Sequence, residues 1–234
     1  MKASDRICVA LDYPSRQEVL AAARRFGPRV GWLKIGLEAF VAEGPQLVRE
    51  EASSSRVFLD LKLHDIPNTV ARAAASAARS GASMVNVHAS GGRAMLSAAR
   101  EALAFAGAPK LIAVTLLTSL DARALADLPM TGEPEAIARR LALLARDCGC
   151  DGVVCSPRDL SAIRSACGAD FLTVVPGIRP AGADPGDQRR AATPAAALSA
   201  GADVLVIGRP VTAALDPDAA LSAILSEIGS ASRE

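Results

Sequence analysis

Three charged residues near the end of one apolar run could carry acid–base chemistry. Asp60 and Lys62 interrupt the run 57–63, and Asp65 follows it. Side chains alternate faces along a strand, so Asp60 and Lys62 should lie side by side on one face. Because burying ionised groups is costly unless they are paired, this pattern needs an explanation. One is a catalytic site in which carboxylates hold an ammonium group. The alternative is an internal ion pair that serves stability alone.

The elements that would position these charges follow a regular order. Short apolar runs, often β-branched, are typical of parallel strands covered on both faces, and we expect them at 7–12, 32–37, 57–63, 84–89, 111–118, 152–156, 171–177 and 204–208. We expect helices at 15–26, 38–52, 68–80, 92–106, 134–147, 157–167, 193–200 and 217–228. Eight such units predict a single-domain α/β protein, a (β/α)8 TIM barrel spanning residues 1–234. A doubly wound open sheet is the alternative.

Local signals refine these boundaries. Ser15 and Ser90 are expected to cap the helices that follow them. Two connections, 119–132 and 178–192, are longer than a barrel requires and contain Gly and Pro. The first is expected to hold a short helix, and the second to act as a lid over a site.

Composition excludes several classes of function. The chain has 234 residues, of which 50% are hydrophobic and only 3% aromatic, and its formal net charge is +1. Neither nucleic acid nor an anionic membrane is therefore expected as a partner. The five cysteines are odd in number and mostly have aliphatic neighbours, which indicates reduced thiols. With no apolar segment as long as a membrane span or a signal peptide, we expect a cytoplasmic protein.

A barrel places its functional residues at the carboxyl ends of its strands. The polar residues expected there are Asp12, Lys34, Asp60, Lys62, Asp65, Asn86, His88, Thr118, Arg179 and Arg209. Within this set Lys34, Asp60, Lys62 and Asp65 would form a chain of alternating charge. Asn86 and His88 are expected to support packing or the residues around the site.

The last predicted strand ends in a pattern suited to phosphate. Gly208 and Arg209 would offer backbone N–H groups and a guanidinium at the start of a helix. Arg179 and Gln188, on the preceding loop, could close over the same anion. The alternative is that Arg209 is an ordinary surface arginine.

Neither a metal nor a cofactor is expected. There are only two histidines, and the ammonium of Lys62 would compete with a cation between Asp60 and Asp65. No Gly-x-Gly-x-x-Gly pattern follows the first predicted strand, so a dinucleotide site is unsupported.

Seven short segments, in order, resemble the orotidine 5'-phosphate decarboxylase family. They are residues 10–12, 34–36, 60–69, 117–119, 176–180, 186–190 and 207–210. The resemblance implies a homodimeric barrel that decarboxylates orotidine 5'-phosphate to UMP and carbon dioxide, without a cofactor, in de novo pyrimidine biosynthesis. Lys62 would protonate the C6 carbanion, and Asp60 would lie beside the substrate carboxylate. Lys34 would join this charge network and contact ribose.

The resemblance also implies roles for the remaining site residues. Asp12 would bind the ribose hydroxyls and Thr118 the pyrimidine. The phosphate would be held by Gln188, Gly208 and Arg209, with Arg179 completing closure of the lid. Asp65, Ile66 and Thr69 would reach into the site of the partner subunit.

Two alternatives remain open at this point. Magnesium-dependent sugar-phosphate decarboxylases and aldolases share the Asp-x-Lys-x-x-Asp pattern, but they carry a glutamate on the second strand where this chain has Lys34. A non-catalytic nucleotide-binding barrel is the other alternative, although binding alone does not need a proton donor between carboxylates.

Overall fold

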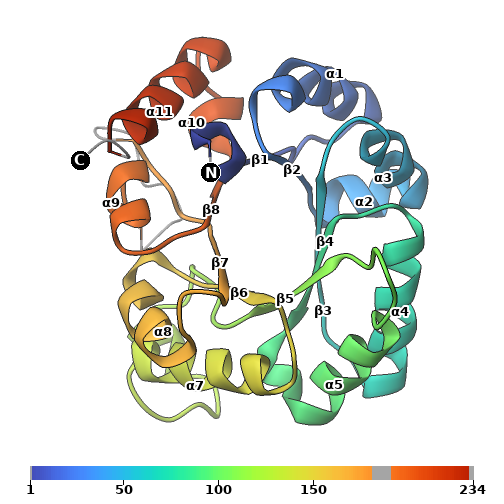
Figure 1. Cartoon of the computed structure of the whole chain (residues 1–234), viewed down its shortest axis with the longest axis vertical. Helices are drawn as coiled ribbons and strands as arrows, with labels where there is room; N and C mark the ends of the chain where they lie inside the picture. Colours follow the sequence, from blue (N-terminus) through green and yellow to red (C-terminus); the bar gives the residue numbers. More distant parts are fainter. Residues whose placement is uncertain (1, 181–190, 232–234) are drawn as a thin grey trace.

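Eight parallel strands form a closed barrel in sequence order. The computed structural model describes residues 2–180 and 191–231. The strands are β1 (Ile7–Ala10), β2 (Trp32–Ile35), β3 (Val57–Leu63), β4 (Met84–His88), β5 (Lys110–Val114), β6 (Gly152–Val154), β7 (Leu172–Val175) and β8 (Val204–Ile207). β8 pairs with β1 and closes the ring, and the helices surround it (Figure 1). The predicted (β/α)8 fold is confirmed, and the open sheet is excluded.

The helices follow the strands in the expected order, but the helix expected over 92–106 ends at Ala102 and the first turn of the one expected over 157–167 is a 3-10 helix. They are α1 (Arg16–Phe26), α2 (Leu37–Glu43), α3 (Pro45–Ala52), α4 (Pro67–Arg79), α5 (Gly92–Ala102), α6 (Ala122–Leu125), α7 (Pro134–Asp147), α8 (Leu160–Cys167), α9 (Pro194–Ser199), α10 (Arg209–Thr212) and α11 (Pro217–Ala231). Short 3-10 helices cover Ala3–Arg6, Gly27–Arg29, Ala89–Gly91 and Pro157–Asp159. The single helix expected over 38–52 is two helices, because Gly44 adopts a φ of 69° and Pro45 starts a new helix.

One of the two expected helix caps is wrong. Ser15 does cap α1, since its side chain accepts a hydrogen bond from the backbone N–H of Glu18. Ser90 instead lies inside the 3-10 helix Ala89–Gly91, and α5 begins only at Gly92. The extra short turn moves the start of the helix beyond the serine.

The apolar run 111–118 continues beyond the end of the strand that it predicts. β5 ends at Val114, and Leu116 packs in a small separate core with Leu125, Ile137 and Ala138. Leu125 belongs to α6, the short helix expected within the loop 119–132. The apolar run therefore continues because Leu116 belongs to a second, separate core, not because the strand is longer.

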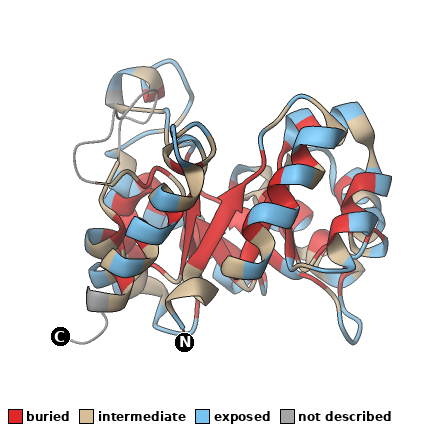
Figure 2. Ribbon diagram, turned by 90° about the horizontal axis from the view of Figure 1, so that it is seen from above, coloured by how far each residue is buried: buried red, intermediate tan, exposed pale blue. Residues whose placement is uncertain are grey.

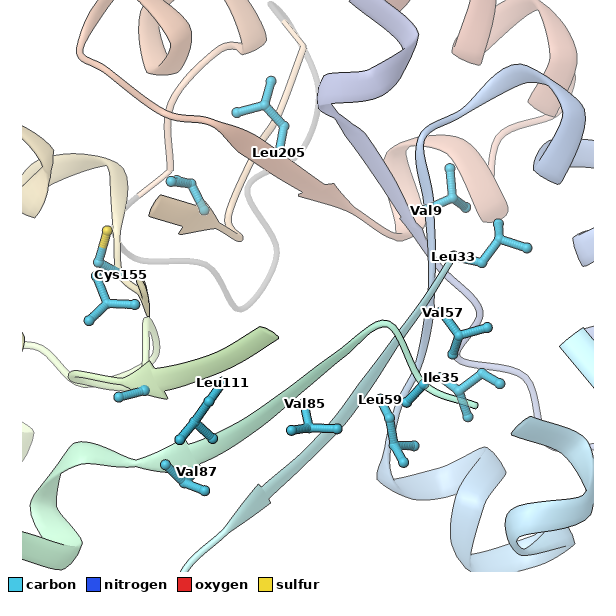
Figure 3. Packing of buried hydrophobic residues seen from close by; sticks show 14 of the residues in the cluster. Val9, Leu33, Ile35, Val57, Leu59, Val85, Val87, Leu111, Cys155 and Leu205 are labelled. Carbon is cyan, nitrogen blue, oxygen red and sulfur yellow. The ribbon is translucent and has the colours of Figure 1, made fainter. Parts of the chain in front are cut away.

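The main core has two layers on opposite faces of the strands. Phe58, Met84 and Val174 belong to the cluster that includes residues of all eight strands and fills the inside of the barrel. The alternate residues, such as Leu59 and Val85, pack outward against the helices (Figure 3). Figure 2 shows the buried strands at the centre and the exposed outer faces of the helices.

The five cysteines are free, and four of them are buried. None of the helices in the described part of the chain is both long and apolar enough to span a membrane.

Candidate active site

The carboxyl end of β3 departs from regular strand geometry at Lys62. Leu59 pairs with Val85 and Leu63 with Val87, so the register shifts between these two pairs. Within residues 2–180 and 191–231, Lys62 is the one non-glycine residue with a positive φ, of 50°. A residue with a side chain in this region carries strain of about 1–3 kcal/mol, and such strain is concentrated at functional sites. The geometry therefore singles out the lysine that the sequence predicts as proton donor.

Four charged side chains of alternating sign run across the ends of β1, β2 and β3. Lys62 Nζ donates to Asp60 Oδ1 at 2.7 Å, and Lys34 Nζ lies 3.5 Å from Asp60 Oδ2. Lys34 Nζ also donates to Asp12 Oδ1 at 2.8 Å. The network is thus Asp12–Lys34–Asp60–Lys62, with two positive and two negative charges.

Gly36, just after β2, leaves room for one of these ion pairs. A Cβ atom at this position would lie 2.7 Å from Asp12 Oδ1 and 2.9 Å from Lys34 Nζ. Any side chain would therefore push the carboxylate and the ammonium out of place. In the sequence this glycine belongs to the segment 34–36, and nothing in the spacing of that segment indicates this role.

The spacing of Asp65 from Lys62 predicted that Asp65 would extend the network within its own chain. The structure shows that it does not. It is exposed, and its Oδ1 accepts a hydrogen bond from the backbone N–H of Ile66 at 2.6 Å. β3 ends at Leu63 and α4 starts at Pro67, so Asp65 lies in the turn between them. Asp12 occupies the end of the charge chain instead.

Within the network, ion pairing outweighs burial in setting the pKa values of its two buried members, Asp60 and Lys34. Burial alone would raise the pKa of Asp60, but Lys34 and Lys62, with hydrogen bonds from Lys62 and Asn86, hold that pKa below its ordinary value. Burial alone would lower the pKa of Lys34, and the carboxylates of Asp60 and Asp12 raise it instead. Both groups are therefore ionised at neutral pH. Their contribution to stability is lost as pH falls through the lowered pKa of Asp60, or rises through the raised pKa of Lys34.

The network forms one wall of a cavity of about 250 Å³ at the carboxyl end of the barrel. Charged residues face apolar ones across this space: it is lined by Asp12, Lys34, Phe58, Asp60, Lys62, Val114, Leu116, Leu117, Thr118, Val154, Pro176 and Val206. A flat ring with polar edges would fit between such walls, with Thr118 available for a hydrogen bond.

A second cavity, of about 360 Å³, adjoins the first and has cationic walls. It is lined by Ala10, Asp12, Lys34, Pro176, Gly177, Arg179, Val206, Gly208 and Arg209. Four of these residues, among them Asp12 and Lys34, line both cavities. Together the two spaces form an elongated cleft with a charge network at one end and two arginines at the other, where an anion such as phosphate would be attracted.

The structure brings together eight of the residues predicted for the site. These are Asp12, Lys34, Asp60, Lys62, Thr118, Arg179, Gly208 and Arg209. Asp65, Ile66 and Thr69 are exposed and line neither cavity. Gln188, with the part 181–190 of the predicted lid, lies outside the described residues.

Two residues without an assigned role also lie beside the network. Asn86, on β4, bonds to both Asp60 and the backbone of Lys62. The ring of His88 lies 5.3 Å from that of His64, and burial, His64 and Lys62 lower the pKa of His88. A signal for Asn86 was present in the sequence, since an amide in the apolar strand 84–88 falls on the same face as Met84, inside the barrel.

The residues at this end of the barrel do not resemble a metal centre. Within the parts of the chain that the structure describes, no group of three or more His, Cys, Asp or Glu side chains is placed to hold a metal ion. On β2, the position that faces Asp60 is taken by the ammonium of Lys34, which repels cations.

Comparison with known proteins identifies the family of the chain. The sequence model of the orotidine 5'-phosphate decarboxylase / HUMPS family matches residues 5–224. A protein from Anaeromyxobacter sp. (strain K) named orotidine 5'-phosphate decarboxylase is 56% identical over 226 residues, which cover 96% of this chain and 98% of the relative. A protein of the same name from Nitrosospira multiformis is 53% identical over 224 residues, covering 95% and 93% of the two chains.

Solved structures agree with the sequence comparison. The crystal structure of orotidine 5'-phosphate decarboxylase from Lactobacillus acidophilus superposes with a TM-score of 0.83 at 36% identity, covering 95% of this chain and 98% of the other. An uncharacterized conserved protein from Geobacillus kaustophilus gives a TM-score of 0.82 at 41% identity, covering 95% and 99%. The chain belongs to the orotidine 5'-phosphate decarboxylase / HUMPS family.

Proposed function

We propose that the chain decarboxylates orotidine 5'-phosphate to UMP and carbon dioxide without a cofactor, as a step of pyrimidine biosynthesis. The observation that carries this proposal is the Asp12–Lys34–Asp60–Lys62 network on the wall of a cleft whose other end holds Arg179 and Arg209. The relatives from Anaeromyxobacter and Nitrosospira, which bear the name of this enzyme, are more than half identical to the chain over nearly its whole length. Its free, mostly buried cysteines suit the reducing cytoplasm, where we place the reaction.

The geometry accounts for the chemistry in two steps. First, the bond between C6 of the pyrimidine and the carboxylate breaks, carbon dioxide leaves, and the electron pair stays on C6. The ring offers that pair no conjugated sink, so a fixed ammonium group, that of Lys62, is the natural stabiliser. Second, Lys62 Nζ transfers a proton to C6 and completes UMP. Asp60, 2.7 Å from Lys62 Nζ, keeps the ammonium aimed at the reacting carbon.

Groups remote from C6 hold the substrate in place. The arginines at the far end of the cleft bind the phosphate, Asp12 and Lys34 contact the ribose, and Thr118 contacts the pyrimidine. Gln188 is proposed as a further contact of the phosphate. Binding energy from the phosphate orients the ring against the charge network, which is how a remote anion can assist the reacting centre.

We further propose that the active unit is a homodimer. Asp65, Ile66 and Thr69 lie on the surface at the carboxyl end of β3, and Ile66 is 67% exposed. Leu37 and Val41, one turn apart on α2, are 53% and 80% exposed at the end of the neighbouring strand. Exposed apolar residues of this kind suit burial against a second copy, which would bring Asp65 into its partner's site.

Loss of the absorbance of orotidine 5'-phosphate on addition of purified protein, with and without a chelator, tests the proposed function. We expect turnover that the chelator does not change. Turnover abolished by the chelator would favour a magnesium-dependent enzyme, the alternative that Lys34 on β2 disfavours. Binding of the nucleotide without turnover would contradict the proposal and favour a nucleotide-binding barrel.

Arg209→Ala should weaken substrate binding more than it slows the chemical step. A hydrogen bond to a charged group contributes about 1.5–3 kcal/mol, so KM should rise roughly 10- to 100-fold. Affinity for UMP should fall in parallel, whereas affinity for uridine, which has no phosphate, should not change. Steady-state kinetics and calorimetry measure these values, with Arg139→Ala on the exposed face of α7 as the matched control. An unchanged KM would refute the phosphate role of Arg209.

A further inference from the structure

Asn86 joins the two central residues of the charge network. It lies on β4, is 1% exposed, and uses both ends of its side-chain amide. Its Nδ2 donates to Asp60 Oδ1 at 2.7 Å, and its Oδ1 accepts from the backbone N–H of Lys62 at 2.7 Å. One neutral side chain thus fixes a carboxylate and a strained backbone at the same time.

The bond to the Lys62 backbone compensates for the irregularity of β3. The shift in register between Leu59 and Leu63 takes the intervening residues out of the regular ladder with β4. A buried N–H group without a partner is costly, and the Asn86 carbonyl supplies that partner. The same bond holds Lys62 at the φ of 50° from which its side chain reaches Asp60.

The bond to Asp60 decides which carboxylate oxygen faces which lysine. Oδ1 accepts from both Asn86 Nδ2 and Lys62 Nζ, while Oδ2 faces Lys34. Without the amide donor, the carboxylate could rotate about its last side-chain bond, because this torsion is broad in aspartate. Asn86 removes that freedom without adding charge to the network.

We propose that Asn86 is a positioning residue for decarboxylation, which acts through Asp60 and Lys62 and does not touch the substrate. This inference rests on the proposed function. It accounts for an amide inside an apolar strand, where a hydrophobic residue would otherwise fill the barrel.

Asn86→Ala should lower kcat by about 10²-fold, the effect expected when catalytic groups move by about 1 Å. Asn86 does not line the cavity that contains Arg179 and Arg209, where the phosphate is proposed to bind. Affinity for UMP should therefore stay within about threefold of the wild-type value. Thr115→Val is the matched control, because Thr115 is equally buried but bonds only to the Val154 carbonyl among described residues. It should leave both values unchanged.

Asn86→Asp tests the positioning role with a side chain of nearly the same shape. It provides a second test in case Asn86→Ala fails to fold. The new carboxylate still accepts from the Lys62 N–H, but it places a like charge beside Asp60. The pKa of Asp60 should rise, and the acidic limb of the kcat profile should move to higher pH. The other groups near Asp60 are Lys34, Lys62, the thiol of Cys8 and the imidazole of His88, which both variants retain.

The decisive measurement is the kcat–pH profile together with ¹³C NMR titration of the Asp60 carboxylate in wild type and both variants. The NMR titration does not require turnover, so it tests the inference even if the wild-type protein fails to decarboxylate orotidine 5'-phosphate, a result that would contradict only the proposed function. A reduced kcat, retained UMP affinity and a raised pKa of Asp60 would support the positioning role. Wild-type kcat in Asn86→Ala, an unmoved pKa of Asp60, or equal losses in kcat and UMP affinity would overturn it.

Discussion

Lys62→Ala should reduce turnover by about 10⁴-fold or more, because proton transfer contributes about 10²–10⁴ and preorganised charge about 10²–10³. The variant lacks both the proton donor for C6 and the cation that stabilises the developing carbanion. Asp60 keeps its contacts to Lys34 and Asn86, so the fold and the remaining network should survive. Loss of absorbance of orotidine 5'-phosphate over hours measures the residual rate.

Binding by this variant separates a chemical role from a structural one. UMP should still bind, since the cavity lined by Arg179 and Arg209 contains no atom of Lys62. Lys110→Ala is a suitable control, because Lys110 is an exposed lysine at the opposite end of β5 from the site. Turnover by Lys62→Ala within tenfold of the wild-type rate would refute the assignment of Lys62 as proton donor.

Asp65→Ala should also abolish most activity, and a mixture of two inactive variants should recover it. If Asp65 completes the partner's site, a mixed dimer of Lys62→Ala and Asp65→Ala subunits contains one intact site and one that lacks both groups. Equal amounts that exchange freely form mixed dimers in half of cases, so activity should return to about one quarter of the wild-type value. Each variant is refolded or incubated with the other before the assay.

The same mixing experiment distinguishes the two positions that Asp65 could occupy. Were Asp65 to act on Lys62 of its own chain, every mixed dimer would carry one defect in each site and activity would not return. Sedimentation of each variant alone provides the control, since both must remain dimeric for the comparison to hold. Wild-type activity in Asp65→Ala by itself would refute any role of Asp65 in the site.

Elements with an unbroken local pattern could be predicted from the sequence. β3 and α7 have the predicted bounds, because the apolar run 57–63 and the helical segment 134–147 end at clear boundary signals. The division of the second helix was not predicted, since a glycine is tolerated in a helix and only the structure shows that Gly44 has a φ of 69°. Strand ends were predicted too long where apolar residues such as Leu116 serve another core.

Most of the residues that line the site could be predicted from the sequence, but the contacts among them could not. Charged residues at the ends of apolar strands can be recognised as site candidates in the sequence, because burying a charge is costly unless it is paired. The sequence predicted Asp65 at the end of the network, and the structure has Asp12 there. The difference depends on how the chain turns after Leu63, which no spacing rule predicts. The amide of Asn86 and the space at Gly36 acquire their roles only from contacts across strands.

At position 62, the left-handed backbone conformation and the proposed reaction favour different residues. Glycine adopts this conformation without steric cost, and asparagine adopts it more readily than other residues with a side chain. A barrel selected for stability alone would therefore favour either of them at position 62. On the role proposed for this residue, a lysine at this position costs the fold about 1–3 kcal/mol, and the reaction is the reason to keep it. Descendants of this chain that abandon the reaction should lose this lysine early, and gain stability by doing so.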